Sequence, residues 1–230
     1  IAAVAELDAV IGAMADGFAT AYDDTKPVWI AASEYVITPV SHVAYPNRVL
    51  REAGLLAVRD AGDGEHLDLA ASRAWALVDH QFSHVFVKDA DAATQRRVAE
   101  LFRGVEGIAE VLAGDERARY ALDHPRSGEV ILVSEPHSWQ AYYWWLDDQR
   151  APGFARTVDI HRKPGYDPVE LHVDMPSRTI PLDATRVKGS HGAPVHSDAQ
   201  RGVIVASQSG VLKRQKLTDV DVYEIVLRQF

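Results

Sequence analysis

The chain alternates segments of helical apolar spacing with short apolar runs, and this alternation constrains the fold more than any other feature. The first segment carries apolar residues at steps of three and four: Val4, Leu7, Ile11, Met14 and Phe18. That spacing places them on one face of a helix. The polar run 23–26 is expected to end this helix, and residues 28–32 to form a short buried strand. Helix, short loop and apolar strand in succession are typical of an α/β fold built in layers.

The alternation continues along the chain. Asn47 is a candidate N-cap for a short helix, and Asp91 is a candidate N-cap for a helix that runs to about Phe102. Further strands are expected at 55–58, 74–78, 84–87, 108–112, 129–133 and 203–206, and further helices at 115–121 and 220–227. The stretch 136–194 is irregular, and long irregular segments in compact domains are often functional. The aromatic run 139–145 within it is expected to be core or interface material, although such rings also stack on bases.

The chain begins at Ile1 without an initiator methionine and inside a helical pattern. We therefore interpret it as a piece of a longer protein whose N-terminus is missing. Within this piece we expect a single α/β domain over residues 1–230, with a small α+β insertion around 66–135. The lack of cysteine is compatible with the cytoplasm and with the periplasm, and we favour the cytoplasm.

Composition excludes several classes of function. Apolar residues make up 47% of the chain and charged residues 25%, as in an ordinary globular protein. Acidic residues outnumber basic ones 33 to 24, and the net charge of −9 argues against a nucleic-acid duplex or an anionic membrane as partner. With no cysteine, a disulfide framework, a zinc–thiolate site and a cysteine nucleophile are excluded. No apolar run approaches the roughly 18 residues of a membrane span.

Three clusters contain the residues suited to chemistry, and the first surrounds Asp79. His80 and His84 follow it and lie four residues apart. That separation places both side chains on the same face of a helix or of a strand. Imidazole and carboxylate groups together suit zinc, manganese or iron. The alternative is a pair of polar residues in a hairpin, hydrogen-bonded to the backbone.

The second cluster runs from Asp159 to Pro168. Asp159 and His161 alternate around an isoleucine, so on a strand they would point the same way. Arg162 and Lys163 are suited to hold a phosphate, and the following Pro-Gly pair fits a type II turn. The alternative is a basic surface turn.

The third cluster is the segment 188–192, in which glycines flank Ser190 and His191. Glycine on both sides lets backbone approach closely and leaves room around the imidazole. The chain contains no G-x-S-x-G elbow, no P-loop and no G-x-G-x-x-G fingerprint. A Ser-His-Asp hydrolase of the elbow type and a P-loop nucleotide site are therefore not indicated.

Four stretches in order resemble a known family: residues 28–35, residues 47–56, residues 104–108 with 127–130, and residues 189–192. The chain resembles the C-terminal part of a bacterial protein of the alkaline phosphatase superfamily, in the type I phosphodiesterase/nucleotide pyrophosphatase branch. The resemblance extends from about Leu7 to Phe230. It implies an alkaline-phosphatase-like layered α/β fold with a mainly parallel central sheet flanked by helices.

The resemblance also implies a metal centre. His191 matches the family histidine that binds one of two metals, most simply zinc. The family motif Ser-Asp-His-Gly is replaced by Ser33, Glu34, Tyr35 and Val36, so Glu34 remains a candidate ligand while Tyr35 is a poor substitute for imidazole. From composition, and not from the family motif, further candidate ligands are Asp79, His80, His84, Asp159 and His161. Arg162 and Lys163 are candidates to contact the substrate phosphate.

The function implied for the full-length protein is metal-dependent hydrolysis of phosphodiester or nucleotide pyrophosphate bonds in a small phosphate ester or nucleotide. The family nucleophile and first metal ligands are expected upstream of residue 1. The change to Glu34 and Tyr35 favours one alternative, a non-catalytic binding module that keeps the superfamily fold. Another alternative is a hydrolase of phosphomonoesters, phosphonates or sulfates. The oligomeric state is not predicted.

Overall fold

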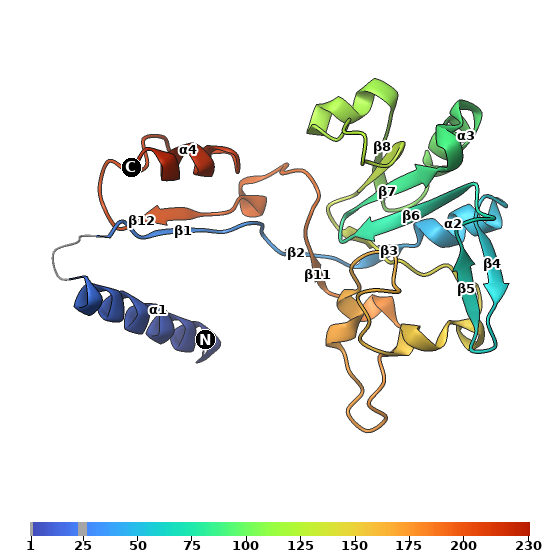
Figure 1. Ribbon diagram of the computed structural model, residues 1–230, viewed down its shortest axis with the longest axis horizontal. Coiled ribbons are helices and arrows are strands. Elements are labelled where there is room, and N and C mark those ends of the chain that lie inside the picture. The colour runs from blue at the N-terminus through green and yellow to red at the C-terminus, as the bar shows by residue number, and fades with distance from the viewer. Residues whose placement is uncertain (1, 23–26) are drawn as a thin grey trace. The chain divides into compact units, whose positions relative to one another are not determined.

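The computed structural model describes residues 2–22 and 27–230 (Figure 1). The polar run 23–26, which the sequence predicts as the end of the first helix, lies outside the described residues. None of the helices within the described ranges is both long enough and apolar enough to cross a membrane.

Contacts divide the chain into two compact units, and each is described by itself. Unit 1 contains the chain up to Glu34 together with Gly202–Phe230, and unit 2 contains Tyr35–Arg201. The single domain over residues 1–230, with an insertion around 66–135, stays a prediction.

Unit 1 is built from α1 (Ala2–Ala21), β1 (Ile30–Ala32), β12 (Ile204–Ala206) and α4 (Asp221–Leu227), with β1 and β12 paired antiparallel. These elements lie where the sequence predicts them. Their burial differs from the expectation, because no described residue of α1 is buried and β1 is largely exposed. Within the described chain β1 pairs with β12 alone, so it is not the buried strand that the apolar run at 28–32 suggested.

The largest sheet of unit 2 has four strands, in the spatial order β6 (Ala74–Asp79), β7 (Phe82–Val87), β9 (Val130–Ser134) and β8 (Ile108–Ala113). Every neighbouring pair in it is antiparallel. Because only His80 and Gln81 separate β6 from β7, these strands must turn back on one another. Parallel pairing joins β3 (His42–Ala44) to β10 (Ser138–Gln140). The mixed α/β class is therefore confirmed, whereas the mainly parallel central sheet is not what the described residues form.

Several smaller elements complete unit 2: α2 (Pro46–Glu52), α3 (Ala92–Phe102), β2 (Thr38–Pro39) paired with β11 (Gly189–Ser190), and β4 (Ala57–Asp60) paired with β5 (Glu65–Asp68). Short 3-10 turns lie at Lys88–Ala90, Gly114–Tyr120, Asp148–Arg150, Gly153–Arg156, Pro168–Leu171, Ala184–Arg186 and Asp198–Gln200. Asp91 caps α3 as predicted, since its carboxylate accepts the backbone N–H of Thr94 over 2.8 Å.

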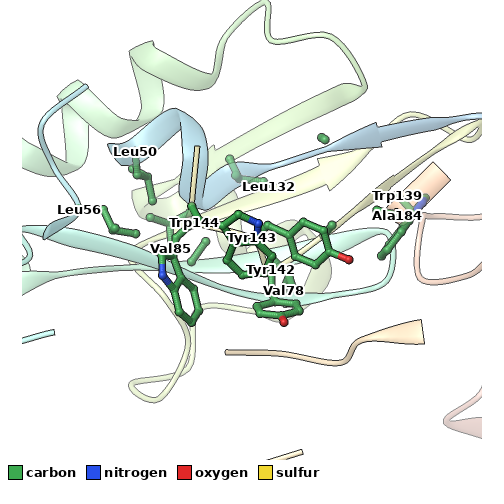
Figure 2. Close-up of a cluster of buried hydrophobic side chains, with 14 of the residues drawn as sticks. Leu50, Leu56, Val78, Val85, Leu132, Trp139, Tyr142, Tyr143, Trp144 and Ala184 are labelled. Atoms are coloured by element: carbon green, nitrogen blue, oxygen red, sulfur yellow. The ribbon is translucent and has the colours of Figure 1, made fainter. Parts of the chain in front are cut away.

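The aromatic run of the irregular stretch forms the centre of the core. Its large side chains are at most 1% exposed: Trp139, Tyr142, Tyr143, Trp144 and Trp145. Figure 2 shows several of them among aliphatic residues such as Leu50, Val78 and Leu132. This confirms core packing for a run that sequence alone left open between core, interface and base stacking.

A buried carboxylate links three segments at the edge of this core. Glu65 is 5% exposed and forms ion pairs with Arg51 at 2.5 Å and Arg150 at 2.6 Å, while its carbonyl accepts the indole N–H of Trp144 over 2.9 Å. The hydrogen bond from Arg51 is the largest cause that holds the pKa of Glu65 below its ordinary value, against the opposing effect of burial. Charge-assisted bonds of this kind favour the ionised carboxylate.

This pKa shift predicts an acid-sensitive contribution to stability. Because the folded pKa of Glu65 lies below its unfolded value near 4.3, the contribution is present above about pH 4.3 and is lost as the pH falls through the folded pKa. We expect wild-type protein to lose more unfolding free energy between pH 6 and pH 3 than Glu65→Gln, measured by urea denaturation at about five pH values in that range. Glu52→Gln, at an exposed position of α2, is the control and should follow the wild type. Equal pH dependence in all three proteins would contradict the assignment.

Candidate functional site: a column of rings at the β6–β7 turn

The turn between β6 and β7 carries two of the residues predicted from the sequence. Asp79 ends β6, and His80 follows with a φ of 54°, a left-handed conformation that residues other than glycine rarely adopt. Oδ1 of Asp79 lies 2.6 Å from Nδ1 of His80. The hydrogen bond from His80 is the largest cause that lowers the pKa of the Asp79 carboxyl. Because an ionised carboxylate can only accept, Nδ1 of His80 is the donor in this pair.

His191 reaches the same turn from the end of β11. The backbone N–H of Gln81 donates to the carbonyl oxygen of His191 over 3.0 Å. The ring centroids of His80 and His191 lie 3.9 Å apart, with their planes tilted by 31°. Gly192 has a φ of 107°, and a Cβ there would lie 3.3 Å from the ring of Phe82. The glycine after the histidine therefore permits the close approach that the sequence pattern suggested.

The second cluster reaches this turn through a backbone bridge. Gly165 forms a parallel β-bridge with Val78, and the N–H of Tyr166 donates to the carbonyl of Val78 over 3.2 Å. Gly165 has the positive φ predicted for it, 129°, and a Cβ there would lie only 2.1 Å from the carbonyl oxygen of Val78. The bridge places the ring of Tyr166 against His80, with centroids 4.8 Å apart and planes tilted by 25°.

Tyr35 completes the arrangement on the other side. Its ring stacks on His191, with centroids 3.6 Å apart and an interplanar angle of 6°. Tyr35, His191, His80 and Tyr166 thus follow one another as a ring column within unit 2, with Asp79 at its edge. The four rings come from segments that are remote in sequence. His80, Tyr166 and His191 come from the first, second and third cluster respectively.

Lys163 is close in sequence to this column, but its amine is already engaged. The side chain is buried, and Nζ donates to the carbonyl of Thr157 over 2.7 Å and to the carboxylate of Asp167 over 3.2 Å, and also contacts Glu170. Burial raises the pKa of Asp167 despite the neighbouring ammonium. A phosphate could bind this amine only after one of these partners is displaced, and contact with substrate stays a prediction for Lys163.

The start of the second cluster, residues 159–162, forms a turn and not a strand. Asp159 accepts the backbone N–H groups of His161 and Arg162 over 3.0 and 3.1 Å, and pairs with the guanidinium of Arg162 at 2.5 Å. These local bonds bend the chain, so Asp159 and His161 do not alternate along a strand as the spacing suggested. The hydrogen bond from Arg162 is the largest cause that lowers the pKa of Asp159.

Two further candidates are not members of the ring column. Glu34 is an exposed residue of unit 1. His84 lies on β7 opposite Leu77, and its Nδ1 accepts the backbone N–H of Gly128 over 3.1 Å. Burial lowers the pKa of His84 and favours its neutral form. The left-handed turn at His80 interrupts the regular spacing between the two histidines. A metal-ligating role for Glu34 and for His84 stays a prediction.

The described side chains do not by themselves form a metal centre. Across residues 2–22 and 27–230, no group of three or more His, Asp or Glu side chains is arranged to hold a metal ion. In the ring column, Oδ1 of Asp79 is bonded to His80, and two overlapping imidazoles present their ring nitrogens in neighbouring planes. A tetrahedral ion needs donors that converge on one point at about 2.0–2.3 Å.

Comparison with known proteins identifies the family. Residues 1–167 match the family model of type I phosphodiesterases/nucleotide pyrophosphatases. The chain therefore belongs to the type I phosphodiesterase/nucleotide pyrophosphatase family, as the sequence resemblance indicated. No curated protein sequence matches it.

Two solved structures resemble the chain over part of its length, and both are of phosphonoacetate hydrolase from Sinorhizobium meliloti 1021. The complex with phosphonoformate is 17% identical, with a TM-score of 0.35, and the match covers 50% of this chain and 28% of that one. The complex with phosphonoacetate is 16% identical, with a TM-score of 0.36, and the match covers 54% and 30%. The chain thus matches less than a third of the length of these structures.

Proposed function

We propose that this chain is part of a hydrolase that cleaves phosphodiester or nucleotide pyrophosphate bonds in a small phosphate ester or nucleotide. Membership of the family, with a match over residues 1–167, is the observation that carries the proposal. The ring column and Asp79 form the part of unit 2 that contributes to the reaction site. We propose the cytoplasm as its compartment.

The contribution of the ring column is proton transfer and orientation. A carboxylate bonded to Nδ1 of an imidazole determines its tautomer and direction, an arrangement suited to a group that moves a proton. Asp79 and His80 have this arrangement at a bond length of 2.6 Å, and His191 lies directly against His80. A cavity of about 180 Å³ adjoins the column at Tyr166, and its lining contains Lys163 and the carboxylates of Asp159, Asp167 and Glu170.

We propose a divalent metal cofactor for the whole protein, and not for this chain by itself. Proteins of this family are generally metal-dependent, and the sequence resemblance suggested two ions, with zinc preferred. The described side chains offer no group of three ligands, so we assign no step of the reaction to a metal held by them.

The proposal predicts a ranking of substrates for the full-length protein. We expect bis-p-nitrophenyl phosphate to be hydrolysed about tenfold or more faster than p-nitrophenyl phosphate or p-nitrophenyl sulfate, as release of p-nitrophenol. Replacing His80 with alanine should lower kcat/KM for the diester about a hundredfold, because proton transfer and positioning are lost together. His196→Ala, at an exposed loop position, is the control and should retain the wild-type rate. Faster hydrolysis of the monoester or the sulfate would contradict the proposed preference for diester bonds.

The stacking of Tyr35 on His191 favours a second candidate function, a binding module without catalysis. The tyrosine lies where the family pattern has histidine, and its ring covers one face of His191 at 3.6 Å. This candidate predicts a folded protein that hydrolyses none of the three esters and retains no divalent metal after dialysis. Metal analysis of the full-length protein alongside the substrate panel therefore separates the two functions.

A further inference from the structure

The outer members of the ring column are two half-exposed tyrosines, and the inner members are two histidines. Tyr35 is 49% exposed and Tyr166 is 54% exposed. Neither ring is held by deep burial, yet each lies nearly parallel to the imidazole beside it. Their inner faces contact the imidazoles, and these contacts limit the directions in which the imidazoles can turn.

Tyr35 is directed to His191 by the pairing of β2 with β11. Thr38 is paired with Ser190 in this antiparallel pair. His191 follows Ser190 directly, and Tyr35 precedes Thr38 by three residues, so both rings lie beyond the same end of the pair. The ring contact at 3.6 Å orients His191 together with the bond from the N–H of Gln81 to its carbonyl and the contact with His80.

Tyr166 is directed to His80 by the bridge at Gly165. The N–H of Tyr166 bonds to the carbonyl of Val78, one residue before Asp79, so the tyrosine follows any movement of the end of β6. His80 is held by Asp79 at one edge of its ring and by Tyr166 and His191 on its faces. Removing one outer ring takes away one of the contacts that restrict the turning of the adjacent imidazole about its side-chain bonds.

We infer that Tyr35 and Tyr166 are positioning residues of the site, which act by holding His191 and His80 between their rings. The inference rests on the proposed hydrolase function and extends it to two residues outside the candidate set drawn from the sequence. The rings act through their flat faces, so the aromatic ring is needed and the hydroxyl is not. Misplacing a reacting group by about 1 Å can lower a rate by about a hundredfold, so loss of either ring should reduce turnover.

The test compares ring removal with ring retention in the full-length protein. We expect Tyr166→Leu and Tyr35→Leu each to lower kcat for bis-p-nitrophenyl phosphate about tenfold, with KM changed by less than about twofold. Tyr166→Phe and Tyr35→Phe should each recover most of the kcat lost in the matching leucine variant. Tyr223→Leu, at an exposed position of α4 in unit 1, should have the wild-type kcat.

Thermal unfolding of every variant accompanies the kinetics and should vary little, because both tyrosines are half exposed. Leucine variants with the wild-type kcat overturn the inference while leaving the hydrolase function in place. Phenylalanine variants as slow as the leucine variants also overturn it, since the hydroxyl would then be the active part. A wild-type protein that hydrolyses none of the esters overturns the hydrolase function itself, and the positioning role with it.

Discussion

Replacing Asn47 with leucine is expected to lower the free energy of unfolding of unit 2 by about 3 to 5 kcal/mol. The side chain is completely buried. Its amide donates to the carbonyls of Ala76 at 2.9 Å and Tyr142 at 3.1 Å, and its oxygen accepts the N–H of Ala76 at 2.8 Å. Leucine leaves three buried backbone groups without partners, each of which costs about 1 to 3 kcal/mol. The hydrogen bonds by which Asn47 joins α2 to β6 and to Tyr142 of the aromatic run are lost together.

Urea denaturation, monitored by tryptophan fluorescence, measures this change in the unfolding free energy of unit 2. Four of the five tryptophans, all except Trp29, belong to unit 2. Gln149→Leu is the matched control at an exposed position and should change the stability by less than about 0.5 kcal/mol. A loss below about 1 kcal/mol for Asn47→Leu, with the same denaturant slope, would show that the three bonds add little to stability.

Asn47 also illustrates which local signals could be predicted from sequence. The pattern indicated a helix cap at this position, by the same reasoning that identified Asp91 correctly as the cap of α3. In the structure Pro46 begins α2, Tyr45 occupies the cap position, and Asn47 lies inside the helix. Capping depends on neighbours three residues away, whereas the partners of Asn47 lie 29 and 95 residues further along the chain. No local pattern encodes such partners.

The same distinction applies to the candidate site. Asp79 and His80 were predicted because a carboxylate beside an imidazole suits metal binding, and His191 was predicted from the family resemblance. Their meeting depends on the β6–β7 hairpin, the β2–β11 pair and the Val78–Gly165 bridge, which join remote segments. Tyr35 and Tyr166 were not predicted as site residues, although the Pro-Gly pair before Tyr166 was a usable signal for a close backbone approach.

Replacing Gly165 with alanine is expected to lower the unfolding free energy by about 3 kcal/mol or more and to reduce turnover as strongly as loss of the Tyr166 ring. The added Cβ would lie 2.1 Å from the carbonyl oxygen of Val78, and the φ of 129° is unfavourable for any residue with a side chain. Backbone strain accounts for about 1 to 3 kcal/mol. The remainder comes from the bond between Tyr166 and Val78, which must lengthen or break.

Gly62→Ala separates the two contributions. Gly62 also has a positive φ, 86°, but a Cβ there would meet nothing within 4 Å, so alanine introduces backbone strain without a clash. We expect it to destabilise by about 1 to 2 kcal/mol and to leave kcat for the diester unchanged. The same urea denaturation and p-nitrophenol assay apply to both variants. If the two alanine variants were equally stable and equally active, the bridge at Gly165 would not be what holds Tyr166 against His80, and the ring column would have to be maintained by the stacking of its own rings.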